Sequence, residues 1–195
     1  MTVWNTSLMS EQGLDLSKYW TEAEFLALGE TDSRIELING KLRVSPSPKK
    51  PHQGICYYLM TFLEPAARRA GLRAFEASDV RLGTDCIVVP DISVGKLGWD
   101  GEITEAGEVA LVVEVTSPSN ARNDRVRKMH LYAAARIPWY LLVEPNMADY
   151  HSVMLQLYRL DGTHYVEHAF ANYGQTLVTD GPFPLRISTT DLIRP

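Results

Sequence analysis

Two nearly continuous apolar runs, ALVVEV at 110–115 and WYLLV at 139–143, constrain most strongly what this chain can fold into. Runs of this kind are typical of strands that are buried on both faces of a sheet. Between them, apolar residues recur at helical spacing over about 123–135. A strand, a helix and a second strand in this order favour a parallel pair joined by a right-handed crossover. These patterns therefore predict a central sheet flanked by helices.

Shorter elements extend this unit on both sides. The run RIELINGKLRV at 34–44 shows two extended stretches around the Asn-Gly pair at 39–40, the strongest short signal of a tight hairpin. A helix is expected over about 53–70, with Pro65 kinking it or starting a second short helix. The C-terminal third shows a hairpin at the Asp-Gly pair 161–162 and further strands. We predict an α/β (α+β) fold, a mixed central β-sheet flanked by helices, with an N-terminal β-hairpin and C-terminal strands.

The length of the chain predicts one folded domain. Its 195 residues suit a single core, and no Ser/Gly linker or internal repeat divides them. Thr21, with Glu24 three residues later, forms a capping-box pattern, so order is expected to begin there. We predict a flexible N-terminal arm over 1–20 and a single domain over 21–195.

Composition and motifs exclude several classes of protein. The hydrophobic fraction of 45% excludes a disordered chain, and no apolar run is long enough to cross a bilayer, so no membrane partner is expected. With only Cys56 and Cys86, a reduced, cytoplasmic setting is the default. The chain lacks P-loop, dinucleotide-binding, G-x-S-x-G and zinc-site patterns. A formal net charge of -5 argues against a nucleic-acid coat protein, but it permits an enzyme with a local basic groove.

Three acidic residues interrupt apolar strand sequences. Glu114 lies within LVVEV, Asp91 follows Pro90 after IVV, and Glu36 interrupts RIELI. A carboxylate without partners in a core strand costs several kcal/mol in desolvation. Three acids entering from strands can converge on one hard cation, Mg²⁺ or Mn²⁺. Alternatively, each acid pairs separately with an arginine or caps a loop.

A basic run, ARNDRVRK at 121–128, follows the strand that carries Glu114. It holds four cations against one acid, Asp124, which lies four residues before Lys128 and so shares a helix face with it. One interpretation is a basic edge that holds phosphates while a lysine points at the metal. The other is a solvated helix face with one ion pair, and the spacing alone leaves both open.

Five strings occur in order between residues 34 and 145, and together they resemble a known family: RIELINGKL, SPSPKKPHQ, VVPDISV, LVVEVTSPSN and NDRVRKMHLYAAARIPWYLLVEP. They are similar to the Uma family of "putative restriction endonucleases", part of the PD-(D/E)XK nuclease superfamily. The resemblance extends from about Thr21 to the C-terminus. It implies a restriction-endonuclease-like core and a magnesium-dependent endonuclease that hydrolyses DNA phosphodiester bonds.

The resemblance also implies roles for individual residues. Asp91 matches the acid of the Pro-Asp element and Glu114 the acid of the following Glu-Val element, which ligate the metal in the superfamily. Glu36 matches an upstream glutamate that assists them. Thr116 stands where the superfamily has the lysine of D/E-X-K, but Lys128 on the following helix matches a lysine of the Uma pattern. Asp91, Glu114 and Lys128 are then the expected catalytic residues.

Four further residues are candidates for binding the substrate. His52 matches a histidine of the Uma pattern, where a substrate-side role and a role in positioning the helix are both open. Ser117 either touches phosphate, orients metal ligands or caps the following helix. Arg122 and Arg125 belong to the basic run that would face DNA.

Two alternatives stand beside the endonuclease. Thr116 in place of lysine favours a catalytically silent nuclease-fold module that binds nucleic acid or protein. The Gly-rich segment 97–108, acting as a lid, would suit a metal-dependent enzyme for a small phosphorylated or carboxylated substrate. For the endonuclease, a homodimer is expected because cleavage of both strands commonly uses two sites.

Overall fold

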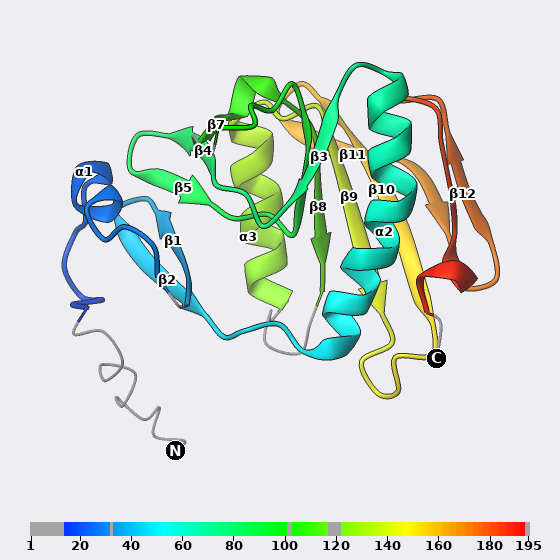
Figure 1. The fold of residues 1–195 in the computed structure, drawn as a ribbon, viewed down its shortest axis with the longest axis horizontal. Coiled ribbons are helices and arrows are strands. Elements are labelled where there is room, and N and C mark those ends of the chain that lie inside the picture. Colours follow the sequence, from blue (N-terminus) through cyan, green and yellow to red (C-terminus); the bar gives the residue numbers. More distant parts are fainter. Residues whose placement is uncertain (1–13, 32, 101–102, 117–121, 194–195) are drawn as a thin grey trace.

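The computed structural model describes residues 14–31, 33–100, 103–116 and 122–193, and for residues 122–125 it describes the backbone alone. Two sheets dominate these residues (Figure 1). A six-stranded sheet forms the centre of the molecule, and a five-stranded sheet lies at the end that carries the short helix α1 (Glu22–Leu26). A separate pair of short strands lies at the opposite end.

The large sheet is mixed, with the order β11-β10-β9-β8-β6-β3. Its strands are β3 (Arg73–Glu76), β6 (Ile92–Gly95), β8 (Val109–Val115), β9 (Trp139–Pro145), β10 (Val153–Asp161) and β11 (His164–Ala171). β8 and β9 run parallel and are joined by α3 (Arg122–Ala134), whereas the other neighbours are antiparallel. This confirms the predicted parallel pair and the mixed α/β fold.

Both faces of the large sheet are covered, which explains the continuous apolar run of β8. Leu111 and Val113 pack in the same core as α2 (Lys50–Arg69), together with β12 (Thr176–Thr179), β13 (Leu185–Ser188) and the short helix η2 (Thr189–Leu192). Val112 lies in a second core with residues of α3 such as Tyr132. Successive residues of a strand point to opposite faces, so both faces of β8 must be apolar.

The small sheet has the order β2-β1-β5-β4-β7. Its strands are β1 (Arg34–Ile38), β2 (Lys41–Ser45), β4 (Val80–Gly83), β5 (Cys86–Val88) and β7 (Thr104–Glu105). β1 and β2 form the expected hairpin, and both turn residues, Asn39 and Gly40, have positive φ angles of 51° and 73°. Such angles define a type I′ turn, which matches the twist of the strands. β7 and the short helix η1 (Ala106–Glu108) come from the Gly-rich segment 97–108, the candidate lid.

The start of the chain is attached to the small sheet earlier than the sequence predicts. Thr21 and Glu24 form the expected capping box of α1 (Glu22–Leu26). Residues 1–13 of the predicted arm lie outside the described residues. Leu14, Leu16 and the buried Trp20, however, pack in the core of the small sheet, and the Trp20 amide donates to the carbonyl of Gly40. The apolar residues of this segment are spaced too irregularly for a helix or a strand. The sequence pattern therefore did not predict that the segment packs on the small sheet.

The helix α2 runs without interruption from Lys50 to Arg69. Pro65 lies inside it, on the exposed side, and does not divide it into two helices. The side chains of Ile55, Leu59 and Leu63 recur at helical spacing and are buried against the large sheet. Among the helices of the described residues, none is long and apolar enough to span a membrane.

Truncation of Leu59 should strongly destabilise the fold because its side chain is fully buried between α2 and the large sheet. We expect Leu59→Ala to lower the free energy of unfolding by about 2–5 kcal/mol, measured by urea denaturation. The control is Thr61→Ala on the exposed side of the same helix, with a change within about 0.5 kcal/mol. Equal effects of the two variants would contradict this packing.

Candidate functional site

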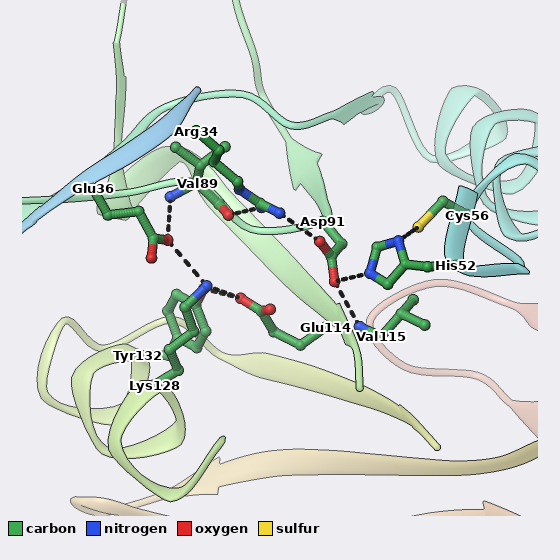
Figure 2. A network of polar contacts seen from close by, with 10 residues as sticks. All are labelled: Arg34, Glu36, His52, Cys56, Val89, Asp91, Glu114, Val115, Lys128 and Tyr132. Carbon is green, nitrogen blue, oxygen red and sulfur yellow. Dashed lines mark hydrogen bonds and ion pairs between the residues drawn. The ribbon is translucent and has the colours of Figure 1, made fainter. Parts of the chain in front are cut away.

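The strands and helices bring the predicted acids and Lys128 into one buried network (Figure 2). Glu36 comes from β1, Asp91 from the residue directly before β6, Glu114 from β8 and Lys128 from α3. Each of these residues is at most 6% exposed. The network therefore lies where the two sheets and α3 meet, among apolar cores that exclude water from most of it.

Asp91 and Glu114 occupy facing positions on neighbouring strands. In the antiparallel pair β6–β8, Ile92 lies opposite Val113 and Ser93 opposite Val112. Extending this register by one residue places Asp91 opposite Glu114. Directly opposed residues of an antiparallel pair project to the same face, with their Cβ atoms about 5 Å apart. Sheet pairing thus places the two carboxylates on one side of the sheet.

Lys128 lies between two of the carboxylates. Its Nζ atom is 3.2 Å from Oε1 of Glu114 and 3.0 Å from Oε1 of Glu36. Tyr132, one helical turn later, donates its hydroxyl to the same oxygen of Glu114. The i,i+4 spacing places both side chains on the face of α3 that packs on the sheet. Figure 2 shows the Lys128 ammonium separating Glu36 from Glu114.

Asp91 is held by three donors from different parts of the chain. Arg34 of β1 donates to Oδ1 at 2.8 Å, and the backbone N–H of Val115 donates to Oδ2 at 2.8 Å. Nε2 of His52, in the first turns of α2, lies 3.2 Å from the same Oδ2. Arg34 also donates to the carbonyl of Val89. Both oxygens of Asp91 are therefore oriented by protein groups.

A second contact orients His52 itself. Cys56 lies one turn further along α2, with its Sγ atom 3.7 Å from Nδ1 of His52. Since an ionised carboxylate only accepts hydrogen bonds, Nε2 carries the proton that faces Asp91. In the neutral imidazole, Nδ1 is then the acceptor for the Cys56 thiol. His52 is thus placed against a catalytic candidate rather than in open solvent.

Burial and neighbouring charges shift the ionisation of the two carboxylates in opposite directions. Burial, reinforced by the charge of Asp91, raises the pKa of Glu114 to about 7 despite the opposing charge of Lys128. Burial also acts to raise the pKa of Asp91, but the His52 hydrogen bond and the Arg34 charge hold that pKa well below its usual range. Burial acts to lower the pKa of Lys128, and the charges of Glu114 and Glu36 outweigh it and raise that pKa.

The donor set suits one hard divalent cation with two protein carboxylates. Asp91 and Glu114 offer the oxygen ligands that Mg²⁺ prefers, and Mg²⁺ usually keeps several waters beside one or two carboxylates. Glu36 instead accepts the Val89 N–H at 2.9 Å and faces Lys128. Within the described ranges, no three His, Cys, Asp or Glu side chains converge as a ready-made metal cluster. The residues therefore fit a two-carboxylate site, and Glu36 as a metal ligand stays a prediction.

The remaining candidates are placed as follows. The hydroxyl of Thr116, at the usual lysine position, donates to the carbonyl of Val143 at 3.4 Å. Ser117 lies outside the described residues. Arg122 and Arg125 belong to α3, but their side chains also lie outside what is described.

Arg34 and Tyr132 are site residues that sequence reasoning missed. Arg34 stands two positions before Glu36 on the same strand and so projects to the same face. Tyr132 stands four positions after Lys128, among the apolar residues of the expected helix. The two-residue period of a strand, counted from Glu36, would have identified Arg34. The four-residue spacing of a helix, counted from Lys128, would have identified Tyr132.

The raised pKa of Glu114 predicts a specific pH dependence of stability. Between the pKa of an unfolded glutamate, about 4.3, and the folded value of about 7, the folded state binds more protons, so stability falls as the pH rises. We expect the free energy of unfolding of the wild type to fall by about 1–3 kcal/mol across this window. In Glu114→Gln this fall should be absent, as measured by the free energy of unfolding at each pH.

The matched control for this measurement is Glu167→Gln, on the exposed side of β11, which should keep the wild-type profile. A Glu114→Gln profile parallel to that of the wild type would show that Glu114 does not titrate in this window.

Comparisons with known proteins agree with this architecture. The chain is similar to a crystal structure described as "a putative nuclease belonging to DUF820" from Anabaena variabilis, with 23% identity and a TM-score of 0.67. The match covers 88% of this chain and 96% of that chain, and at this identity it shows a shared fold. A search of curated proteins found no match.

A family model described as "Putative restriction endonuclease" matches residues 22–190. This range contains the four network residues that the sequence predicted, Glu36, Asp91, Glu114 and Lys128. Because the match spans most of the sequence, the chain belongs to the Uma2 family of restriction-endonuclease-like proteins.

Proposed function

We propose that this chain is an endonuclease that hydrolyses phosphodiester bonds in DNA with Mg²⁺, or Mn²⁺ in its place. The observation that carries the proposal is the pairing of Asp91 and Glu114 at facing strand positions, with Nζ of Lys128 3.2 Å from Glu114. Two oxygen ligands and an adjacent ammonium group are the components of metal-assisted phosphoryl chemistry. Membership of a restriction-endonuclease-like family supports the same reaction class.

In the proposed mechanism, each side chain has a separate task. Asp91 and Glu114 would hold the metal, which when bound would supply polarisation of a phosphoryl oxygen and a lower pKa for a bound water. Lys128 stays protonated because Glu114 and Glu36 stabilise its charge, so it can donate to the attacking water or to a phosphoryl oxygen as negative charge develops. Glu36 holds Lys128 at 3.0 Å and thereby sets the position of the ammonium.

The location of Lys128 supports its use in place of the superfamily lysine. Thr116, at the usual lysine position, engages the carbonyl of Val143. Lys128 reaches Glu114 from α3, a different backbone origin, and is 6% exposed. A buried ammonium fixed by two carboxylates is already oriented before substrate binds, which is the condition for efficient charge stabilisation.

One observation favours the silent nuclease-fold module as the second candidate. Lys128 and Arg34 already pair with Glu36, Glu114 and Asp91. The network is thus close to neutral without a metal and can serve as a structural element. A binding module of this kind would bind nucleic acid or protein without any requirement for Mg²⁺.

Cleavage assays with Asp91→Asn and Lys128→Met separate these candidates. The wild type should cut at least one of supercoiled, linear, single-stranded and branched DNA in Mg²⁺ or Mn²⁺, and not in EDTA. Each variant should lose at least about 100-fold in rate while its circular dichroism spectrum stays that of a folded protein.

Glu167→Gln, an exposed acid-to-amide change on β11, serves as the control and should cut like the wild type. Wild-type protein that cuts none of these substrates would support the silent module, and full activity of Asp91→Asn would exclude the proposed metal site.

The role of Glu36 can be tested by the metal dependence of cleavage. If Glu36 positions Lys128, Glu36→Gln should lower kcat by about 10- to 100-fold while the Mg²⁺ concentration at half-maximal rate stays unchanged. Glu114→Gln is the comparison variant and should raise that concentration. A comparable rise for Glu36→Gln would instead identify Glu36 as a metal ligand.

A further inference from the structure

A cavity of about 660 Å³ lies beside the carboxylate network. Its described walls come from three directions: α1 and the loop after it, β1, and the loops at 47–48 and 77–79. Phe25, Leu28 and Ile103 supply half-buried apolar surface. The volume is within the range of about 300–1,000 Å³ that is typical of small-ligand sites.

Two residues of the cavity wall touch the network directly. Arg34 lines the cavity and donates to Oδ1 of Asp91 at 2.8 Å. Val89 also lines it, and the Val89 N–H donates to Glu36. An occupant in contact with Arg34 is therefore one side chain away from Asp91. This continuity makes the cavity an extension of the proposed catalytic site.

The chemistry of the cavity walls indicates an occupant with three parts: an apolar ring, hydrogen-bond donors and an anionic group. The apolar surface of Phe25, Leu28 and Ile103 suits a face of a flat ring system. Exposed Asp79 and Glu30 repel an anion at their positions but accept hydrogen bonds from ring N–H or amino groups. Arg34, which is paired with Asp91, is the one cation among the described lining residues, so an anionic group is best accommodated on that side of the cavity. A nucleotide combines these parts, with a base that carries N–H donors at its edge and an attached phosphate.

We propose that this cavity takes one unpaired nucleobase of the DNA strand, next to the phosphodiester that lies at Asp91 and Glu114. The inference rests on the proposed nuclease function and adds a substrate class to it. A base paired and stacked inside a duplex cannot enter such a cavity, so the target nucleotide is single-stranded or flipped out of the helix. Single-stranded or branched DNA is therefore the preferred substrate.

The test combines two changes: one base is removed from the DNA, and the cavity of the protein is filled by a tryptophan substitution. Binding of a fluorescent pentanucleotide is measured by anisotropy in EDTA, where no metal-dependent cleavage competes, with each position in turn made abasic. In the wild type, the abasic change at one position should weaken binding by at least about tenfold. In Ser47→Trp, which fills the cavity from an exposed loop, the same change should cost less than twofold.

Leu26→Trp introduces the same indole from the α1 side and should give the same loss of base dependence. The matched control, Thr61→Trp, lies on the exposed side of α2 outside the cavity and should keep the wild-type dependence.

The inference is wrong if no abasic position weakens binding in the wild type, or if both tryptophan variants keep the tenfold effect. It is also wrong if the variants change only the oligomeric state in sedimentation, since a second copy would then cover the cavity. Failure of the nuclease function itself appears separately, as wild-type protein that cuts no DNA in Mg²⁺.

Discussion

The buried ammonium of Lys128 is the interaction on which the rest of the site depends. It joins Glu36 of the small sheet to Glu114 of the large sheet, so one charge connects both sheets to α3. Buried ion pairs contribute little net stability compared with apolar packing, but removing one partner leaves a buried charge without compensation. The network therefore makes the relative position of the two sheets depend on residues that carry chemistry.

Arg34 and Asp91 form a second connection between the same two sheets. The pair links β1 to the start of β6, and the Val115 N–H and His52 supply the other hydrogen bonds to Asp91. The difference in hydrogen-bond donors helps to explain why the pKa values of the two buried acids shift in opposite directions. Asp91 receives three donors and remains ionised, whereas Glu114 receives two, from Lys128 and Tyr132, and burial together with the charge of Asp91 raises its pKa to about 7. Neighbouring positions in one sheet thus provide two carboxylates with different properties.

Much of the fold follows from local pattern, because helices and strands reveal their buried faces through periodicity. The unit β8–α3–β9 and the hairpin at 39–40 were predicted for this reason. Pro65 and residues 14–20 show the limits of local pattern. A proline on the exposed side of α2 does not end the helix, and the packing of Trp20 on the small sheet depends on residues distant in sequence.

The sequence by itself determined that acids at 36, 91 and 114 interrupt apolar strands, and that a lysine follows on a helix face. Such residues are conspicuous because a buried charge is costly. Only the tertiary structure decided their partners. Arg34 meets Asp91 across 57 positions and Glu36 accepts the Val89 amide across 53. Separations of this length along the sequence leave no local pattern. Sheet order and register, rather than spacing along the chain, bring these atoms together.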